Sequence, residues 1–190
     1  MIRKDREVVE YLIENRNKTL NIRNIAQGLK LDYRNAHNIV KRLQMENIVA
    51  LQIMGKSKNI MLKNILTPLL YEAEDRRRQV ILKNKNIKTI ADYFINLKTK
   101  LFVLILFGSY AKRKASVQSD IDLLCIVPND DIDIQKAAAM LPEKLNVHMN
   151  ILTEKEFISM KNSKEDTIVS ETVKNNIILY GIEAYYGYLQ

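Results

Sequence analysis

Apolar residues recur at helical spacing in the first third of the chain and predict three helices followed by a hairpin. Each helical segment places apolar side chains three or four positions apart, and Asp32 stands before the third as a suitable N-cap. Two short apolar segments then flank a Gly-Lys-Ser-Lys-Asn turn, which is typical of a β-hairpin. The expected helices are 4–16, 22–29 and 33–46, and the expected strands are 48–54 and 60–62.

The rest of the chain alternates helical patterns with short apolar runs. Thr67-Pro68 is a helix-start signal, and no Gly or Pro follows before Asn86, so a connecting helix is expected there. A fully apolar run at 101–107, bounded by Lys100 and Gly108, predicts a buried strand. Further strands are expected from Ile121 and at 145–152, and further helices at 88–98, 132–141 and 154–176, and residues 177–181 are expected to close the chain with an apolar segment and a turn. These patterns predict an α+β fold.

Two short segments, Gly108-Ser109 and Asp120-Ile121-Asp122, interrupt this apolar pattern in a chemically informative way. Gly108 ends the buried strand, and a residue without a Cβ lets the backbone turn sharply and approach a ligand. Ser109 is expected to cap the following turn, leaving N–H groups free for a phosphate. Asp120 and Asp122 share one face of the next strand, where two carboxylates repel each other unless a cation neutralises them. Hard oxygen ligands favour Mg²⁺ or Mn²⁺.

Gly108-Ser109, ten intervening residues and Asp120-Ile121-Asp122 together resemble the signature of the DNA polymerase β-type nucleotidyltransferases, closest to the minimal nucleotidyltransferases. The resemblance covers roughly residues 88–188 and implies a mixed β-sheet flanked by helices for this part of the chain. It implies that the Gly-Ser turn grips the triphosphate of ATP or another nucleoside triphosphate and that the Asp pair binds divalent ions. A nucleoside monophosphate would then pass to an acceptor, with release of pyrophosphate.

The resemblance fails at a third carboxylate, which the family carries on a neighbouring strand. The candidate strand 145–152 presents Asn146, His148 and Asn150 on its polar face, and none is an acid. His148 is either a neutral nitrogen ligand, better suited to Mn²⁺ or Zn²⁺ than to Mg²⁺, or a half-buried strand histidine without a ligand role. Acids in flanking segments are alternative sources of the missing carboxylate. They are Asp130, Asp131, Asp133 and Glu154.

Three basic residues follow the Gly-Ser turn, and they have two interpretations. Lys112 stands where fixed positive charge would offset the charge of a bound phosphate, but Lys112, Arg113 and Lys114 also suit a solvated basic turn. Minimal nucleotidyltransferases usually have a small residue, often Gly, where Arg113 stands.

The N-terminal pattern resembles a winged helix-turn-helix domain, in which the helix from Tyr33 would be the recognition helix. Its polar side and the basic hairpin turn would then contact DNA bases and phosphates. The alternative is a module for protein contacts or dimerisation. The candidate DNA-binding residues are Arg34, Asn35, Asn38, Lys41, Arg42, Lys56 and Lys58.

Charge is unevenly distributed along the 190 residues. Residues 1–100 hold 21 Lys and Arg against 10 Asp and Glu, a net charge of +11, whereas residues 101–190 hold 9 against 12, a net charge of −3. This asymmetry favours a polyanion as partner of the N-terminal part. We expect a winged-helix domain at 1–64, a connecting helix at 65–87 and a nucleotidyltransferase domain at 88–190.

Cysteine content and the lack of an apparent targeting segment bear on where in the cell the protein is expected. The one cysteine, Cys125, excludes an intramolecular disulfide framework and is expected to fill the core. No signal peptide and no transmembrane run is apparent, so no membrane partner is expected and the predicted location is the cytoplasm.

Three functions fit these features. The first is a metal-dependent nucleotidyltransferase coupled to a DNA-binding module. The second is a DNA-binding regulator whose transferase half has become a nucleotide sensor, as the missing third acid suggests. The third follows from the resemblance, because relatives of the minimal transferases often act as antitoxins beside a small helical toxin. A homodimer is also plausible, because winged-helix proteins often pair to read two half-sites.

Overall fold

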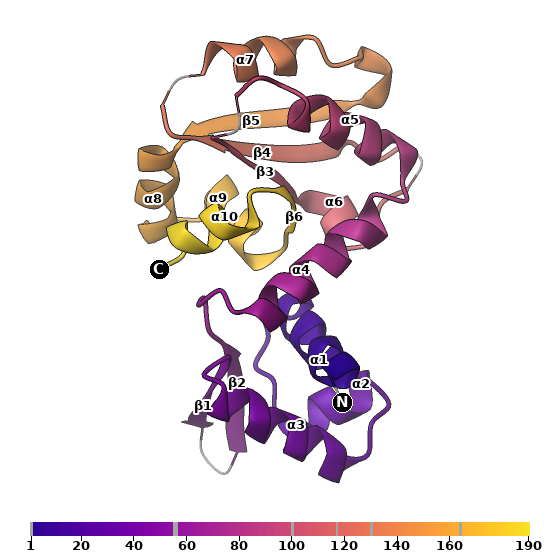
Figure 1. Ribbon diagram of the computed structural model, residues 1–190, viewed down its shortest axis with the longest axis vertical. Coiled ribbons are helices and arrows are strands. Elements are labelled where there is room, and N and C mark those ends of the chain that lie inside the picture. Colours follow the sequence, from indigo (N-terminus) through magenta and orange to yellow (C-terminus); the bar gives the residue numbers. More distant parts are fainter. Residues whose placement is uncertain (1, 55–56, 100, 117, 130, 164) are drawn as a thin grey trace. The chain divides into compact units, whose positions relative to one another are not determined.

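The protein has an α+β fold, as predicted (Figure 1). The computed structural model describes residues 2–54, 57–99, 101–116, 118–129, 131–163 and 165–190. The chain divides into two compact units, Met1–Arg76 and Arg77–Leu189, with the division inside one helix, α4 (Pro68–Ile81). Each unit has its own core and is described separately.

The first unit contains the helices and the hairpin that the apolar spacing predicts. The side chain of Asp32 accepts a hydrogen bond from the backbone N–H of Asn35, so the predicted N-cap is confirmed. The two strands pair in antiparallel register from Val49 opposite Leu62 to Met54 opposite Ser57. The elements are α1 (Ile2–Glu14), α2 (Ile22–Gly28), α3 (Tyr33–Met45), β1 (Val49–Met54) and β2 (Ser57–Leu62).

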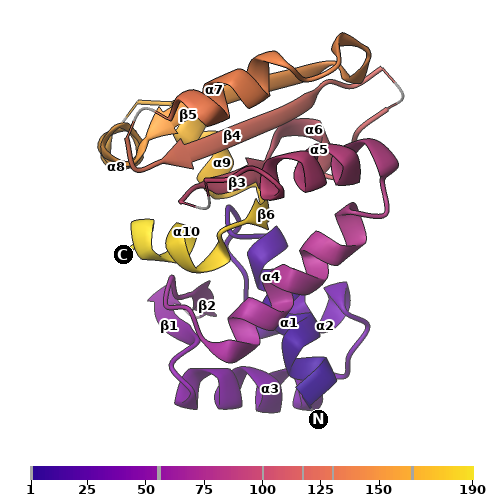
Figure 2. The same ribbon diagram turned by 45° about the horizontal axis from the view of Figure 1, so that its top comes forward.

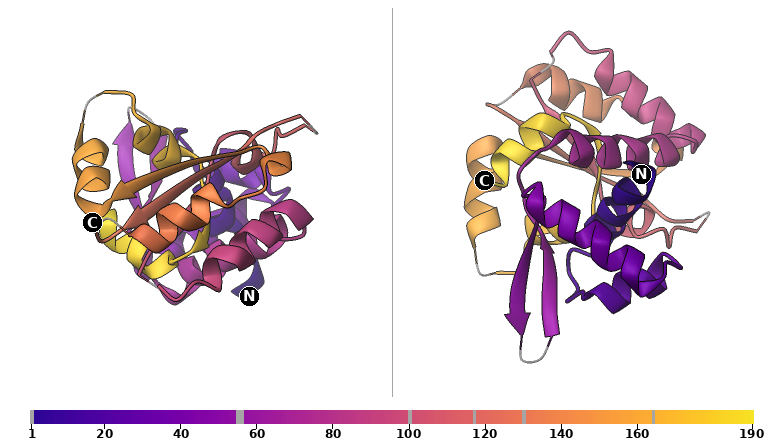
Figure 3. Two further views of the ribbon diagram at one scale, coloured as in Figure 1. Left: turned by 90° about the horizontal axis from the view of Figure 1, so that it is seen from above. Right: turned by 60° about the horizontal axis from the view of Figure 1, so that its bottom comes forward.

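The core of this unit lies between α1, α3 and the base of the hairpin. Apolar residues of all three helices are buried, and the backbone N–H of Ile60 donates to the carbonyl of Leu20 at 2.7 Å, which ties the hairpin to the segment before α2. The rest of the hairpin extends away from the helices (Figure 3, right). The buried set includes Val8, Val9, Leu12, Ile25, Ala36, Ile39, Val40 and Leu43.

The second unit is built on a four-stranded mixed sheet in the order β5-β4-β3-β6. β3 pairs antiparallel with both β4 and β6, whereas β4 and β5 are parallel, so β4 and β5 begin at the same edge of the sheet. The strands are β3 (Val103–Leu106), β4 (Ile121–Val127), β5 (Val147–Thr153) and β6 (Ile177–Tyr180).

Helices cover both faces of this sheet. α5 (Lys85–Ile95) and α7 (Ile132–Ala139) pack on the face to which Ile121, Leu123 and Cys125 point. The other face is covered by α8 (Glu154–Asn162), α9 (Ile168–Lys174) and α10 (Ile182–Tyr188) (Figures 1 and 2). Cys125 is confirmed as a buried core residue, and burial raises the pKa of its thiol to about 12.

Several predicted boundaries differ from those observed. The expected helix at 154–176 is two helices, because Thr167 caps a new one after a break. The connecting helix ends at Ile81, and Asn84 caps the next. Gly108–Ala111 forms a short helix, α6, in place of an open turn, and Glu143–Leu145 forms a 3₁₀ turn. Within the described residues, no helix combines the length and the apolar composition that a bilayer crossing demands.

Candidate active site

The carboxylate of Asp122 lies directly over Gly108. The backbone N–H of Phe107 donates to the carbonyl of Asp122 at 3.0 Å, which aligns the end of β3 with the start of β4. Gly108 then adopts φ +66°, a left-handed conformation that L side chains rarely adopt. A Cβ at this position would lie 2.0 Å from Oδ2 of Asp122, closer than any real Cβ contact. The glycine is therefore required both by its backbone angle and by the space that the carboxylate occupies.

Asp120, Asp122 and His148 come together at the common edge of β4 and β5. Asp122 is the register partner of His148 in the parallel pair. The Nδ1 atom of His148 lies 3.8 Å from Oδ2 of Asp120 and 3.8 Å from Oδ1 of Asp122. The structure therefore brings together the three side chains that the sequence singled out as candidate metal ligands. The described parts of the chain contain no group of three or more His, Cys, Asp or Glu side chains already arranged as a complete metal site.

Asn146 orients Asp120. It precedes β5 with φ +49°, a left-handed conformation that Asn tolerates better than most residues. Its side-chain amide donates to Oδ1 of Asp120 at 2.6 Å, and its carbonyl accepts from the backbone N–H of Ile121 at 2.9 Å. One oxygen of Asp120 is thus fixed by Asn146 while the other faces His148. The sequence placed Asn146 on this polar face without indicating its partner.

The environment of Asp122 disfavours its negative charge. The side chain is 28% exposed, and burial raises its pKa above the ordinary value for aspartate. His148 and Lys112 lower this pKa, whereas the negative charges of Asp120 and Glu171 raise it further. A cation bound next to Asp122 would offset both the cost of burying its negative charge and the repulsion between the carboxylates.

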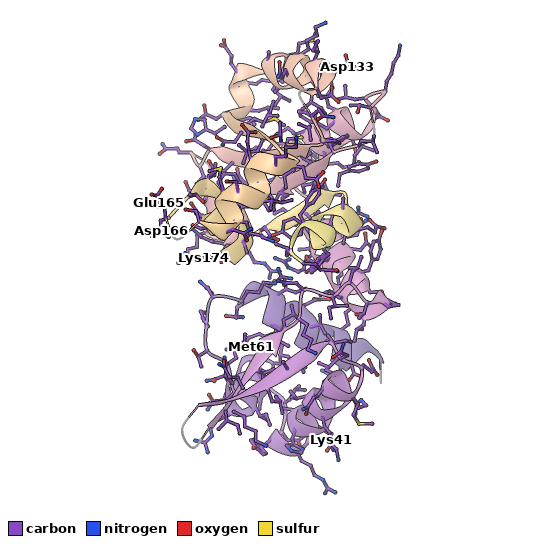
Figure 4. The ribbon with its side chains drawn as sticks, turned by 90° about the vertical axis from the view of Figure 1, so that its left-hand side faces the viewer. Lys41, Met61, Asp133, Glu165, Asp166 and Lys174 are labelled. Carbon is purple, nitrogen blue, oxygen red and sulfur yellow. The ribbon has the colours of Figure 1, made fainter. Side chains whose placement is uncertain are left out.

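An open cleft of about 600 Å³ adjoins Asp122. Its walls come from the end of β3, the end of α6, the polar face of β5 and one side of α9. Lys112 lines the cleft, and its Nζ lies 2.7 Å from Oε1 of Glu171 on α9. At the rim, Nζ of Lys174 lies 3.4 Å from Oδ1 of Asp166 (Figure 4). The cleft also contacts Phe107, His148, Asn150, Thr167, Ile168, Ser170 and Asn175.

The Gly-Ser turn differs from the prediction in one respect. Ser109 does not cap the helix, because the N-cap position of α6 belongs to Phe107, which makes no side-chain cap bond. Ser109 lies inside the first turn, and its carbonyl accepts from the N–H of Lys114 at 2.9 Å. Arg113 has φ +55°, a left-handed conformation that glycine adopts more readily than an L residue.

The flanking acids considered for the third carboxylate lie at the wrong end of the sheet. Asp131 caps α7, which follows the far end of β4, and Asp133 is exposed in the first turn of that helix. Glu154 begins α8, directly after the far end of β5. Asp130 lies outside the described residues. Sequence reasoning missed Glu171 and Asp166, which line the cleft but are more than 40 residues from the Asp pair along the chain.

On the first unit, the structure separates the predicted DNA-binding residues into four groups, of which the last is Arg42. Arg34, Asn38 and Lys41 are exposed on α3, and so is Lys58 on β2 (Lys41 in Figure 4). Asn35 is exposed, but its side chain bonds Asp32. Lys56 lies outside the described residues.

Arg42 has a structural partner. Its guanidinium donates two hydrogen bonds to the carboxylate of Asp5, which joins α3 to α1 and raises the pKa of Arg42. It is therefore part of the packing between these helices.

Residues 87–175 match the nucleotidyltransferase domain family. The matched segment contains the Gly-Ser turn, both aspartates, His148 and Glu171. The match supports the predicted relationship to the nucleotidyltransferase superfamily for this segment. No curated protein matches the chain.

Two solved structures are similar to parts of the chain. One is the MepR–DNA complex of S. aureus, at 17% identity over 48% of this chain and 75% of that chain, with a TM-score of 0.34. The other is a toxin–antitoxin complex with AMP-PNP, at 21% identity over 54% of this chain and 77% of that chain, with a TM-score of 0.35.

Proposed function

We propose that the C-terminal unit transfers a nucleoside monophosphate from a nucleoside triphosphate, such as ATP, to an acceptor hydroxyl. The single observation that carries this proposal is the carboxylate of Asp122 seated over Gly108, at the mouth of a cleft of about 600 Å³. This arrangement places the backbone turn that would receive the phosphates next to the side chain that would hold their counter-ion. The family match over residues 87–175 supports the same chemistry.

The donor set fits a divalent cation. Asp120 and Asp122 would hold Mg²⁺ or Mn²⁺, because each has an oxygen 3.8 Å from Nδ1 of His148 and the surroundings of Asp122 disfavour its negative charge. His148 would add a nitrogen ligand, which favours Mn²⁺ over Mg²⁺. When bound, such an ion offsets phosphate charge and lowers the pKa of an attacking hydroxyl.

Other groups would act on the nucleotide. The first turn of α6, which begins at Gly108, would offer backbone N–H groups and the Ser109 hydroxyl to the triphosphate, and Lys112 would add positive charge from the wall of the cleft. The acceptor oxygen attacks the α-phosphorus, the bond from the α-phosphorus to the bridging oxygen breaks, and pyrophosphate leaves. Positioning and electrostatics supply most of the acceleration in such transfers.

Release of pyrophosphate from ATP tests this function. Wild-type protein should release pyrophosphate with Mg²⁺ or Mn²⁺, and Asp122→Asn should abolish the release. The matched control is Asp133→Asn, which removes an exposed acid at the opposite end of the sheet and should retain wild-type activity. Equal activity in wild type and Asp122→Asn would exclude this site.

One observation favours a second candidate function, nucleotide sensing without turnover. The face of β5 that meets Asp122 carries His148 and Asn150 and no acid. An incomplete carboxylate set would bind the metal–nucleotide complex yet catalyse poorly. In that case ATP should bind in a metal-dependent way and be recovered unchanged after prolonged incubation. Binding of a small helical toxin, the third function considered, stays a prediction.

For the first unit we propose DNA binding through α3 and the hairpin. The exposed side chains Arg34, Asn38 and Lys41 lie on one helix, and Lys58 lies on the hairpin strand β2. Residues 1–76 hold 14 Lys and Arg against 9 Asp and Glu, a net charge of +5, which supports a polyanionic partner. Binding to a duplex of random sequence should weaken steeply as salt rises.

A further inference from the structure

One ion pair joins two of the segments that line the cleft beside Asp122. Lys112 follows α6, the helix that starts at Gly108, and Glu171 lies in α9. Their charged atoms are 2.7 Å apart, although 59 residues separate them along the chain. The side chains are 37% and 46% exposed, so the pair lies in the accessible wall of the cleft and an entering ligand can reach it.

The face of β5 beside Asp122 carries no acid, and Glu171 is the acid of the cleft best placed to supply the missing carboxylate. It lines the same cleft as Asp122 and His148, and its charge contributes to the raised pKa of Asp122. Asp166, the other acid contributed by this side of the cleft, is almost fully exposed and faces Lys174. Glu171 therefore faces the same cleft as a substrate held at Asp122, and Lys112 would have to release it before it could act there.

We propose that Lys112 exchanges partners during the reaction, leaving Glu171 for the triphosphate, and that the released Glu171 serves as the general base for the acceptor hydroxyl. This inference rests on the proposed nucleotidyl transfer. A triphosphate carries several negative charges and offers Lys112 more than one oxygen, so it competes effectively with a single exposed carboxylate.

The chemical step balances. Glu171 takes the proton of the acceptor hydroxyl while the acceptor oxygen bonds to the α-phosphorus. The bond between that phosphorus and the bridging oxygen breaks, and its electron pair leaves with pyrophosphate. Before nucleotide arrives, Glu171 is neutralised by Lys112, so the base becomes available only when the phosphates are in place.

The exchange predicts that removing Glu171 strengthens nucleotide binding while weakening catalysis. The probe is α,β-methylene ATP with Mn²⁺, which binds but cannot undergo transfer, titrated into full-length protein in a calorimeter. Glu171→Gln should bind it about two- to fivefold more tightly, because Lys112 no longer has to leave an exposed ion pair. In a Lys112→Gln background the same substitution should leave affinity unchanged.

A matched control breaks an ion pair of similar geometry away from the cleft. Nζ of Lys88 lies 2.6 Å from Oδ2 of Asp92 on α5, and both side chains are exposed. Asp92→Asn should change neither nucleotide affinity nor turnover. Glu171→Gln should lower pyrophosphate release from ATP by about 10²- to 10⁴-fold, the usual contribution of a general base. Glu171→Ala should behave alike, and thermal unfolding should show that both variants fold.

The outcomes separate this inference from the function on which it rests. If wild type binds and turns over ATP, Asp122→Asn abolishes both, and Glu171→Gln changes neither, then the nucleotidyl transfer stands and the exchange is wrong. Weaker nucleotide binding in Glu171→Gln also overturns the exchange, because it would make Glu171 a ligand of the nucleotide complex from the start. If wild type binds no nucleotide, both proposals fail.

Discussion

The carboxylate of Asp122 occupies the position that a side chain at residue 108 would need: an added Cβ would lie 2.0 Å from its Oδ2 atom. The relationship joins the end of β3 to the start of β4, two antiparallel neighbours in the sheet. It explains why a glycine follows the buried strand and why an acid stands 14 positions later. Each residue constrains the other, so their substitutions have different and measurable effects.

Gly108→Ala should lose both stability and nucleotide binding. The left-handed backbone alone costs an L residue about 1–2 kcal/mol, and displacement of Asp122 adds to this. The control is Gly187→Ala in α10, where an added Cβ meets nothing within 4 Å and alanine should raise helix stability by about 0.5–1 kcal/mol. Chemical denaturation measures both changes. Similar stability in the two variants would contradict the strained geometry at Gly108.

Asp122→Asn should stabilise the metal-free protein at neutral pH. Because the folded-state pKa of Asp122 lies above the unfolded value of 3.8, the folded state binds the proton more tightly. Its contribution to stability is therefore most favourable below the unfolded pKa and is lost as pH rises through the folded pKa.

At about pH 7.5, where aspartate is ordinarily ionised, the variant should unfold at higher temperature than wild type. The expected gain is a few tenths of a kcal/mol to about 1 kcal/mol, as for other partly exposed charges. The difference should shrink when both proteins are measured near pH 3.5 and when Mn²⁺ is added to wild type. A variant less stable than wild type at neutral pH would contradict the unfavourable charge on Asp122.

Asn146→Gly should weaken metal binding without unfolding the protein. Glycine keeps the left-handed backbone at φ +49° but removes the amide that holds Oδ1 of Asp120. Loss of such a supporting hydrogen bond typically lowers metal affinity about 10- to 100-fold. Mn²⁺ titration in the presence of ATP measures the affinity, and unchanged affinity would show that Asp120 needs no support.

His148→Asp should shift the metal preference. The substitution places a third carboxylate opposite Asp122 in the parallel register and removes the nitrogen donor. An all-oxygen set favours Mg²⁺, so the ratio of Mn²⁺ to Mg²⁺ affinity should fall. The metal-free variant should be less stable than wild type, because His148 no longer lowers the pKa of Asp122 and a like charge replaces it. An unaltered ratio would mean that His148 does not contact the ion.

Arg34, Lys41 and Lys58 should contribute to DNA affinity through phosphate charge. Replacing all three by Ala should reduce the slope of log affinity against log salt by about 2.7, since each phosphate contact contributes about 0.9. Arg42→Ala should instead lower the stability of the first unit, because it breaks the pair with Asp5. Mobility-shift titrations at several salt concentrations distinguish the two effects.

Local patterns in the sequence predicted the helices, the strands and the Gly108-to-Asp122 motif. Those features depend on residues close together in the chain, and the alternation of apolar and polar positions places Asp122 and His148 on the polar faces of their strands. That these two strands are neighbours was an expectation from the resemblance to the nucleotidyltransferases, and their register comes only from the structure.

The remaining parts of the site depend on tertiary structure. Glu171 reaches Lys112 only because a break before Thr167 turns one expected helix into two and directs α9 along the cleft. The role of Asn146 depends on a left-handed backbone that no apolar pattern signals. For the same reason, the candidate acids Asp131, Asp133 and Glu154 were plausible by proximity in sequence yet follow the far ends of their strands.

The central claim is that Asp120 and Asp122 hold a divalent cation together with a triphosphate at Gly108. Calorimetric titration of ATP into the wild-type protein, with and without Mn²⁺, tests it most directly. The account predicts saturable binding that requires Mn²⁺ and disappears in the Asp120→Asn, Asp122→Asn double variant. Binding of equal strength without the metal, or in the double variant, would contradict it.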